Sequence, residues 1–379
     1  MSSRTTVPFH SWARSAQRDW PRLEERLTQV LDRGVFTAGQ AAGELEAALA
    51  GFTGARHAVG CNSGSDALAI MLRAAGIGPG DEVVVPAYTF FASASAVLHV
   101  GAEPVFVDVL PGSYAMDPEA VVRAVTPRTR AIMPVHLFSQ MADMPALTKI
   151  AADHGLTVLE DSAEAIGMRT RGRHAGLWGR AGVLSFFPTK TLGAIGDAGM
   201  LLTDDDGIAE RARMLTVHGR HPDGTGRHEL LGWNSRLDEV QACVLLTRLE
   251  RLEEEIARRA ELAARYTEGL SGLAEVRVPW PRPPARPEDQ VWYVYLIECE
   301  RRDELVAFLE QRGVGTEVYY PRPLTHQPAL AHRPGVRHPV PVAEASARRA
   351  VGLPMYPDLT EAQVDHVVGA VRAFYQGAS

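Results

Sequence analysis

The sequence predicts an α/β protein, with a large domain built on a mostly parallel sheet and a small α+β domain at the C-terminal end. Between Arg56 and about Asp204, short β-rich runs alternate with helical stretches, which is typical of a parallel sheet covered by helices on both faces. After Asp205 this alternation stops. The 379 residues, of which 46% are hydrophobic and 22% charged, suffice for two domains or for one large domain that carries a smaller one.

Six short apolar runs are the expected strands of the large sheet: Glu82–Pro86, Pro104–Val109, Ala131–Leu137, Thr157–Asp161, Gly182–Phe187 and Gly199–Thr203. Between them we expect helices at Ser65–Ala75 and Asp143–His154, because their apolar side chains recur at helical spacing. Gly76 and Gly155 follow these helices, at the position where glycine commonly ends a helix.

The second part of the chain predicts a loop, a helix and a linker. His218–Gly232 is rich in His and Gly and predicts a loop, whereas the segment from Leu237 to about Leu270 is dense in Glu, Arg, Ala and Leu and predicts one long helix. Pro279–Pro287 contains five prolines among nine residues, a composition typical of a linker.

Beyond this linker the pattern predicts a small α+β unit. Its expected elements are a strand at Val291–Glu298, a helix at Arg302–Arg312, a strand at Gly315–Tyr320 and a helix at Thr360–Tyr375. The predicted division is therefore a large domain at residues 1–235, a long helix with the proline-rich linker at 236–290, and a small domain at 291–379.

Composition argues against several classes of protein. Lys and Arg number 39 against 46 Asp and Glu, a net charge of −7, so the electrostatic footprint of a nucleic-acid binder is missing. Cys61, Cys243 and Cys299 lie far apart without CxxC spacing, which favours a reducing compartment and argues against a metal site built on them. No run approaches the ~18 uninterrupted apolar residues of a membrane span, and the N-terminus lacks the apolar core of a signal peptide. We therefore expect a cytoplasmic protein that binds neither nucleic acid nor membrane.

The most informative stretch runs from Ser185 to Gly193, where a strand ends in Lys190 between small residues and glycine. A lysine at a strand end commonly extends its amine into solvent. The same position suits a Schiff-base lysine, whose amine becomes nucleophilic when a partly dry site lowers its pKa.

A second feature bears on that choice, since the carboxylates of Glu160 and Asp161 end the apolar run Thr157–Asp161. An acid at the end of a buried strand is costly without a cationic partner. The pyridinium nitrogen of pyridoxal phosphate is such a partner, and keeping it protonated lets the ring act as an electron sink. Asp161 also suits the cap of a following helix, and both roles stay open.

Two further features lie at the ends of predicted elements. At Gly64 and Ser65 a loop opens a helix, where free backbone N–H groups favour a phosphate, although the same pattern is an ordinary helix cap. Three aromatic residues, Tyr88, Phe90 and Phe91, follow the strand Glu82–Pro86 at the end where α/β sheets hold ligands. An aromatic side chain there suits either stacking on a planar ring or filling of the core.

In this order and with this spacing, the four features resemble one family, the sugar aminotransferases of the DegT/DnrJ/EryC1/StrS type. The resemblance covers nearly the whole chain and includes Gly34–Gly39, Val135–Met144, Gly232–Ala242 and Gly315–Pro321. It implies the fold of a fold-type I pyridoxal-phosphate transferase with a seven-stranded sheet. It also implies an aminotransferase that uses pyridoxal 5′-phosphate, with pyridoxamine 5′-phosphate as the intermediate form.

The resemblance implies roles for single residues around the cofactor ring. Lys190 would hold the cofactor as a Schiff base and later move the proton between the substrate carbon and C4′. Asp161 would pair with the pyridine nitrogen, and Phe90 would stack on the ring. Glu164 would lie near the 3′-oxygen of the ring, where a carboxylate must be protonated or bridged because two close anions repel.

Other residues are implied at the phosphate and at the substrate. Gly64 and Ser65 would bind the phosphate together with the hydroxyl of Ser185. Asn234 would reach the phosphate from a neighbouring subunit, which implies a homodimer with shared active sites. The substrate would meet three further residues: Tyr319, His326 and Arg220.

The resemblance implies L-glutamate as amino donor and a keto group of a nucleotide-linked deoxysugar as acceptor. A dTDP-4-keto-6-deoxyhexose is favoured, with a 3-keto sugar or a keto-cyclitol as alternatives. More distant alternatives are a sugar dehydratase, which would have lost the lysine, and a non-catalytic ligand-binding homologue. No metal is expected, because the ring supplies the electron sink and His218, His221 and His228 lack the spacing of a metal site.

Overall fold

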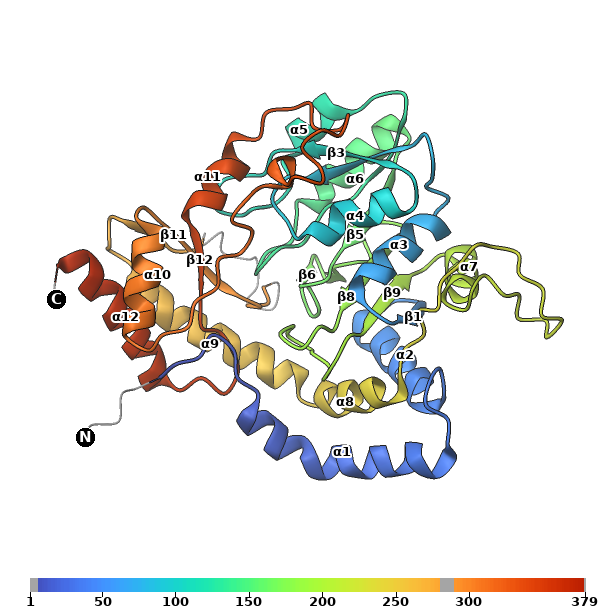
Figure 1. The fold of residues 1–379 in the computed structure, drawn as a ribbon, viewed down its shortest axis with the longest axis horizontal. Helices are drawn as coiled ribbons and strands as arrows, with labels where there is room; N and C mark the ends of the chain where they lie inside the picture. The colour runs from blue at the N-terminus through green and yellow to red at the C-terminus, as the bar shows by residue number, and fades with distance from the viewer. Residues whose placement is uncertain (1–5, 280–289, 378–379) are drawn as a thin grey trace.

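The computed structural model describes residues 6–279 and 290–377, which form a large α/β unit and a smaller α+β unit beside it (Figure 1). The large sheet contains seven strands: β1 (His57–Cys61), β2 (Glu82–Pro86), β3 (Glu103–Val107), β4 (Thr129–Ile132), β5 (Thr157–Asp161), β8 (Ala181–Ser185) and β9 (Gly199–Thr203). Their spatial order is β1-β9-β8-β5-β4-β2-β3. β9 runs antiparallel to β1 and β8, and the other neighbouring pairs are parallel. The predicted mostly parallel, seven-stranded sheet is confirmed.

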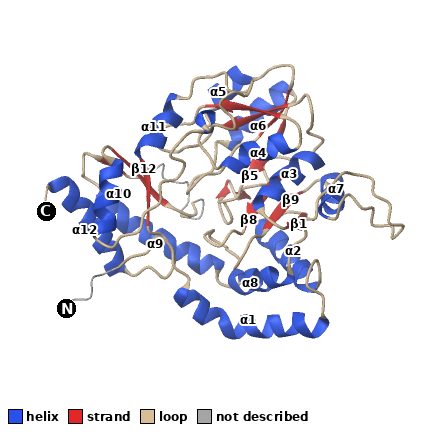
Figure 2. Cartoon of the chain, in the orientation of Figure 1, coloured by secondary structure: helices blue, strands red, loops and turns tan. Residues whose placement is uncertain are grey.

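Helices cover both faces of this sheet, as Figure 2 shows. One face carries α3 (Gly64–Ala74), α4 (Phe91–His99) and α7 (Asp206–Thr216). The other carries α2 (Gln40–Thr53), α5 (Pro118–Ala124), α6 (Met144–His154) and α8 (Glu239–Leu249). Strand alternation explains this division, because Val83 and Val85 of β2 belong to the core of the first face and Val84 to that of the second.

A separate core lies in the C-terminal part of the chain. The antiparallel strands β10 (Val276–Arg277), β11 (Tyr295–Cys299) and β12 (Ala350–Leu353) pack against α9 (Leu252–Leu270), α10 (Arg302–Gln311) and α12 (Glu361–Gln376). Val7 is fully buried in this core. The next helix, α1 (Ala13–Arg33), runs along α8 of the large unit (Figure 1). The N-terminal arm therefore connects the two cores.

The chain between η2 (Leu324–His326) and α11 (Pro341–Arg349) returns to the free edge of the large sheet. The N–H of Phe106 in β3 donates to the carbonyl oxygen of Gly335 at 3.2 Å. The carboxylate of Asp108, just after β3, accepts the N–H groups of Val342 and Ala343 in the first turn of α11, at 2.9 and 2.8 Å. These bonds cover the edge strand and hold α11 on the large unit.

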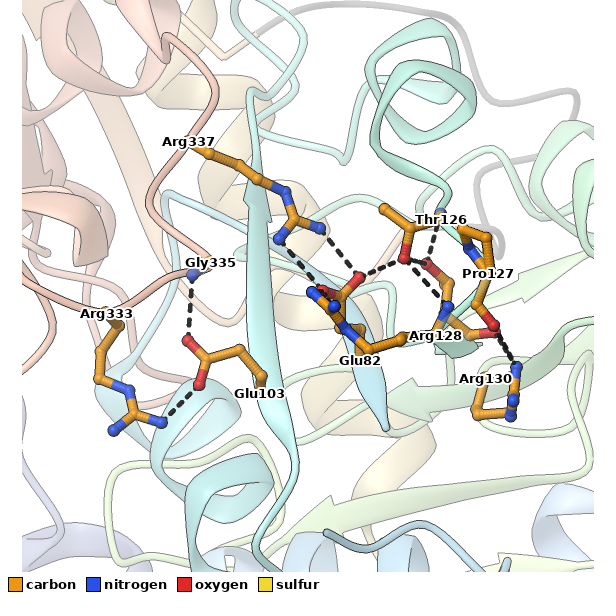
Figure 3. A network of polar contacts seen from close by, with 10 residues as sticks. Glu82, Glu103, Thr126, Pro127, Arg128, Arg130, Arg333, Gly335 and Arg337 are labelled. Atoms are coloured by element: carbon orange, nitrogen blue, oxygen red, sulfur yellow. Dashed lines mark hydrogen bonds and ion pairs between the residues drawn. The ribbon is translucent and has the colours of Figure 1, made fainter. Parts of the chain in front are cut away.

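Two glutamates, Glu103 of the edge strand β3 and Glu82 of the neighbouring β2, strengthen the attachment with ion pairs (Figure 3). Glu82, 1% exposed, accepts from both terminal guanidinium nitrogens of Arg337 at 3.1 and 2.9 Å. Glu103 accepts the N–H of Gly335 at 3.0 Å and pairs with Arg333. Burial by itself raises the pKa of Glu82, but hydrogen bonds, that of Arg337 above all, lower it to about 2. The attachment is therefore expected to weaken only as the pH falls toward this value.

Two predicted elements are wrong. The expected single helix from Leu237 to about Leu270 is interrupted at Glu250 and Arg251, so that α8 packs on α2 while α9 packs on α12. The expected strand Gly315–Tyr320 is not formed, because Glu317 alone of these residues makes a β-bridge and Tyr320 has a left-handed backbone with φ 54°. Both differences depend on packing partners that a local pattern does not show.

The remaining elements agree with the prediction or lie outside it. The four predicted helices at Ser65–Ala75, Asp143–His154, Arg302–Arg312 and Thr360–Tyr375 are confirmed to within about one residue. The predicted strands at Pro104–Val109, Ala131–Leu137, Gly182–Phe187 and Val291–Glu298 are present with shifted ends. The prediction does not name α1, α2, α4, α5, α7, α11, β1, β10, β12 or the hairpin of β6 (Arg169–Thr170) and β7 (Arg173–His174). Most of Pro279–Pro287 lies outside the described residues, and the domain division stays a prediction.

No helix in the described part of the chain is both long enough and apolar enough to span a membrane.

Glu239 of α8 gives a test of how α8 is joined to α2 on the same face of the sheet. Its carboxylate, in a residue that is 2% exposed, accepts the N–H groups of Gly39, Ala41 and Ala42 at the start of α2, at 2.9, 2.8 and 2.9 Å. Glu239→Ala leaves these buried donors without an acceptor, so we expect the free energy of unfolding to fall by about 2–3 kcal/mol in urea denaturation. Glu253→Ala, at an exposed position of α9, is the control and is expected to change it by less than about 0.5 kcal/mol. Equal effects of the two substitutions would contradict the role of Glu239.

Candidate functional site

The carboxyl ends of β5 and β8 lie side by side, because these two strands are parallel neighbours. Asp161, the last residue of β5, pairs in register with Val183, and β8 continues for two residues to Ser185. The segments that follow the two strands therefore meet at the carboxyl end of the sheet, where α/β sheets hold ligands.

The turn after β8 presents Lys190. The N–H of Lys190 donates to the carbonyl oxygen of Phe187 at 2.8 Å. Trp12 of the N-terminal arm donates to the carbonyl oxygen of Pro188 at 3.0 Å, and Arg248 of α8 donates to that of Gly193 at 2.6 Å. A Cβ at Gly193 would lie 2.4 Å from the Pro188 oxygen, which explains the glycine in this stretch. The lysine is therefore held by partners from three parts of the chain.

The amine of Lys190 is enclosed rather than extended into solvent, since its side chain is 15% exposed. Its Nζ lies 3.0 Å from Oε1 of Glu164 and 4.5 Å from the centre of the Tyr293 ring. Burial is the largest single effect and lowers the pKa of Lys190, but the charge of Glu164, Tyr293, the hydrogen bond to Glu164 and Asp161 together outweigh it, so that the pKa is raised. The expectation of a lowered pKa is wrong for the chain by itself, in which the amine is a paired ammonium.

Asp161 is buried beside this lysine, 4% exposed. Its Oδ2 accepts a hydrogen bond from the hydroxyl of Ser93 in α4 at 2.7 Å, and its Oδ1 accepts the N–H of Ala163 at 3.2 Å. No cation of the described residues lies within 4.0 Å of either oxygen. Asp161 is thus a buried, oriented carboxylate that has a place for a positive partner.

Glu164 lies on the turn after β5, with its side chain 5% exposed. One carboxylate oxygen accepts from Lys190, and the other accepts the N–H of Phe138 at 2.8 Å. The structure therefore brings Asp161, Glu164 and Lys190 into one cluster, as the sequence predicted.

Gly64 and Ser185 face each other where α3 meets β8. A Cβ at Gly64 would lie 2.6 Å from Cβ and 2.9 Å from Oγ of Ser185, so glycine is required for this approach. Ser63 caps α3 by accepting the N–H of Asp66 at 3.1 Å. The N–H groups of Gly64 and Ser65, the first two residues of α3, have no acceptor within the helix. The free N–H groups of Gly64 and Ser65 and the hydroxyl of Ser185 thus line one candidate phosphate site.

Phe90 and Tyr319 lie at the rim of the cluster. Phe90 immediately precedes α4, is 58% exposed and has its ring centre 6.3 Å from that of Tyr320. This exposure excludes the alternative that Phe90 fills the core. The ring of Tyr319 lies 5.5 Å from Phe138 and 6.4 Å from Tyr293, so Tyr319 adjoins the residues that contact Glu164 and Lys190.

Three predicted residues lie elsewhere in the single chain. Asn234 is exposed and accepts from Nε of Arg236 at 3.1 Å. Arg220 makes a backbone bridge to His228 within the loop between α7 and α8, which extends away from the sheet in Figure 1. The imidazole of His326 pairs with Glu344 of α11 at 3.5 Å. None of these contacts places the three residues beside Lys190, so their roles stay predictions.

Sequence reasoning missed three residues that contact the cluster: Ser93, Phe138 and Tyr293. Ser93 carried a weak signal, because its spacing of four residues from Thr89 places both hydroxyls on one side of a helical turn, 3.2 Å apart. Phe138 acts through its backbone N–H, and Tyr293 is brought in from the small unit, so neither role has a local pattern. Within residues 6–279 and 290–377, no group of three or more His, Cys, Asp or Glu is placed to hold a metal ion.

These residues fit pyridoxal 5′-phosphate. The carboxylate of Asp161 lacks a cation that a protonated ring nitrogen would supply. The free N–H groups of Gly64 and Ser65, at the positive end of a helix, suit a phosphate. Lys190 supplies an enclosed amine, paired with Glu164 in the same cluster as Asp161.

Comparison with known proteins gives a consistent result. Residues 19–372 match the model of the DegT/DnrJ/EryC1/StrS aminotransferase family. The chain is 42% identical over 375 residues to a dTDP-3-amino-3,4,6-trideoxy-alpha-D-glucose transaminase of Streptomyces venezuelae, covering 98% of both chains. It is 43% identical over 360 residues to a UDP-N-acetyl-3-dehydro-alpha-D-glucosamine 3-aminotransferase of Acidithiobacillus ferrooxidans, covering 94% of this chain and 95% of the relative.

The fold has a similar counterpart among solved structures. The crystal structure of S. venezuelae DesV in complex with a ketimine intermediate superposes with a TM-score of 0.92 at 42% identity, covering 98% of this chain and 99% of that one.

Gly64→Ala tests the candidate phosphate site at the start of α3. Because the added Cβ would meet Ser185 at 2.6 Å, helix α3 or the serine must shift, and we expect pyridoxal 5′-phosphate to bind about tenfold or more weakly in a fluorescence titration. Gly43→Ala in α2, where a Cβ meets nothing within 4 Å, is the matched control and should bind as the unaltered chain does. Unchanged affinity in both variants would show that Gly64 does not shape the phosphate site.

Proposed function

The chain belongs to the DegT/DnrJ/EryC1/StrS aminotransferase family, and we propose that it transfers an amino group from L-glutamate to the C3 keto group of a nucleotide-linked sugar. It is an aminotransferase that depends on pyridoxal 5′-phosphate. The observation that carries the proposal is the enclosed amine of Lys190 beside the buried, cation-free carboxylate of Asp161. When bound, the cofactor supplies the electron sink that lets an amino group leave one carbon and join another.

Lys190 is the residue that would hold the cofactor and, when free, move a proton at the substrate carbon through Nζ. The chain contains one other lysine, Lys149, which lies on α6 with its side chain 74% exposed and paired with Asp153. An exposed lysine paired in this way is remote from any dry site, so Lys190 is the amine suited to the chemistry.

Asp161 would keep the ring nitrogen protonated. The hydroxyl of Ser93 and the N–H of Ala163 orient its two oxygens before any ligand binds, so little reorganisation is needed. Gly64, Ser65 and Ser185 would bind the phosphate, and Phe90 would stack on the ring. Together these residues would hold the cofactor at its ring nitrogen, its ring face and its phosphate.

The position of the keto group is proposed from the relatives. The sequence favoured a dTDP-4-keto-6-deoxyhexose and kept a 3-keto sugar as an alternative. The names of two relatives at 42% and 43% identity, over nearly the whole chain, refer to an amino group at position 3 or to a 3-aminotransferase. We therefore place the 3-keto sugar first and retain the 4-keto sugar as the competing substrate.

The two remaining alternatives are less well supported. A sugar dehydratase of this fold would have lost the Schiff-base lysine, whereas Lys190 is present and enclosed. A non-catalytic ligand-binding homologue would not need the cluster of Asp161, Glu164 and Lys190 to be complete.

We propose further that the enzyme is a homodimer with shared active sites. Several large apolar side chains are exposed: Val35, Phe36, Phe90, Phe187 and Ile195. Phe36 and Ile195 make backbone contacts with the start of α8, through Glu239 and Gln241, so at least these two share one region of the surface. A second copy would cover this apolar surface, and Asn234, exposed in this chain, would then reach the phosphate of the other site.

A cytoplasmic location is part of the proposal. Cys61, Cys243 and Cys299 are all buried and free, as is typical of a reducing compartment.

The substrate proposal predicts the outcome of a direct comparison. With L-glutamate as donor, a dTDP-linked 3-keto-6-deoxyhexose should be aminated about tenfold or more faster than the 4-keto isomer, because the site must orient one carbon toward Lys190; product formation is followed by mass spectrometry. Lys190→Ala should abolish amination of both sugars, and Lys149→Ala should leave it unchanged. Faster amination of the 4-keto isomer would overturn the C3 assignment, and full activity of Lys190→Ala would overturn the catalytic one.

The shared active site predicts complementation between inactive variants. Lys190→Ala and Asn234→Ala should each be impaired alone, but after mixing and subunit exchange about a quarter of the sites should be intact, since each mixed dimer has one complete site. Mixing Lys190→Ala with Asp161→Asn is the control, because both changes affect the same site of each chain and no site is restored. Equal recovery in the two mixtures, measured as glutamate-dependent amination, would rule out a contribution of Asn234 across the interface.

A further inference from the structure

Glu164 joins the lysine to the backbone of the β4–α6 connection. Its Oε1 accepts from Nζ of Lys190 at 3.0 Å, and its Oε2 accepts the N–H of Phe138 at 2.8 Å. Both partners are held independently, Lys190 by its turn and Phe138 by the connection. The carboxylate is 5% exposed, so water competes little for either oxygen. Glu164 therefore spans a fixed distance between two anchored groups.

The direction of the Phe138 N–H depends on an unusual backbone. Phe138 has a φ of 63°, the left-handed region, which costs a residue other than glycine about 1–2 kcal/mol. Two other aromatic residues, Tyr114 and Tyr320, have φ values of 59° and 54°. The rings of all three are in contact, with centres 5.3 Å apart for Phe138 and Tyr114 and 6.0 Å apart for Phe138 and Tyr320. Aromatic packing thus offsets the strain and holds the N–H that binds Glu164.

The charges around the pair make Glu164 the main partner of the lysine. Lys190 faces Glu164, Tyr293 and the more distant Asp161, and burial by itself lowers its pKa. The charge of Glu164 is the largest of the effects that raise this pKa, and together with Tyr293, the hydrogen bond to Glu164 and Asp161 it raises the pKa overall. Tyr319 and Tyr320 also lie within the electrostatic influence of Glu164: burial, Tyr293 and then Glu164 raise the pKa of Tyr319, and burial and then Glu164 raise that of Tyr320. Among the described residues, Lys190 is the one cation within 4.0 Å of the Glu164 carboxylate.

We propose that Glu164 is the positioning residue of Lys190: it holds the free amine as an oriented ammonium inside the site, and Phe138 holds Glu164 in turn. This inference deepens the proposed function, on which it rests, and is independent of the sugar accepted. It also fits a carboxylate at a position that the resemblance places beside another anion, since the ammonium of a free Lys190 would offset the negative charge of Glu164. Removing the charge of Glu164 should therefore release the proton of Lys190 at lower pH.

The experiment is competitive acetylation of the full chain by a short pulse of acetic anhydride at a series of pH values, with peptide mapping by mass spectrometry. Acetylation requires the neutral amine, so its rate against pH gives the midpoint of each lysine. Because the chain contains only Lys149 and Lys190, the exposed Lys149 is an internal reference in every sample.

In Glu164→Gln we expect the midpoint of Lys190 to fall by about 1–3 pH units, so that at a pH below both midpoints acetylation is about tenfold to a thousandfold faster. The midpoint of Lys149 should not move. Glu164→Asp keeps the charge but has a side chain one methylene shorter. The midpoint of Lys190 in this variant should lie between those in the unaltered chain and in Glu164→Gln. It keeps the test available if Glu164→Gln folds poorly, as judged by circular dichroism. Glu317→Gln is the matched control, since this exposed glutamate lies on the same segment as Tyr319 and is not among the groups that act on Lys190.

Failure of the role of Glu164 and failure of the proposed function of Lys190 would give different results. A midpoint of Lys190 in Glu164→Gln equal to that of the unaltered chain would overturn the role of Glu164. Addition of pyridoxal 5′-phosphate to the unaltered chain should protect Lys190, but not Lys149, from acetylation; absence of this protection would instead count against Lys190 as the cofactor-binding residue.

Discussion

The parallel pairing of β5 with β8 is the constraint on which the site depends, because it places the residues after both strands at the same carboxyl end of the sheet. Asp161 and Lys190 lie 29 residues apart in sequence, and they come to the same end of the sheet because Asp161 pairs with Val183 in this register. The antiparallel β9 then brings Gly199 against Ser63, where a Cβ on the glycine would lie 2.4 Å from the serine carbonyl carbon. The start of α3 and its free N–H groups are thereby seated beside Ser185.

Strand alternation separates the two adjacent carboxylates that end β5. Glu160, fully buried, accepts the N–H groups of Gly176 and Gly179 at 2.9 and 2.6 Å and pairs with His136 at 2.8 Å. Asp161 points to the opposite face, toward Ser93. The charge of Glu160 is therefore used to hold the loop before β8, while that of Asp161 has no cation among the described residues and remains available to a ligand.

The small unit contributes side chains to the site, and these side chains come from connecting segments rather than from a strand or a helix. Tyr293 and Tyr319 reach the cluster from either side of α10, and the hydroxyl of Tyr88 donates to the Tyr319 carbonyl oxygen at 2.8 Å. The ion pairs of Glu82 and Glu103 hold the returning segment on the sheet edge. Since these contacts join the units on both sides of the site, the position of the tyrosines relative to Lys190 is determined by the large sheet.

The sequence by itself determined the fold class and most of the central strands, because strand and helix periodicity are local properties. It also indicated Lys190, Asp161 and Gly64 as candidate site residues, since their residue types at strand and helix ends narrow the chemistry that they can perform, and the family resemblance added Ser185. Only the tertiary structure decided that Glu164 pairs with Lys190, that the pKa of Lys190 is raised, and that Ser93, Phe138 and Tyr293 complete the cluster. It also decided where the helix after Leu237 breaks. These features arise from contacts between distant segments, and neither a local pattern nor a residue type specifies which buried charge will find which partner.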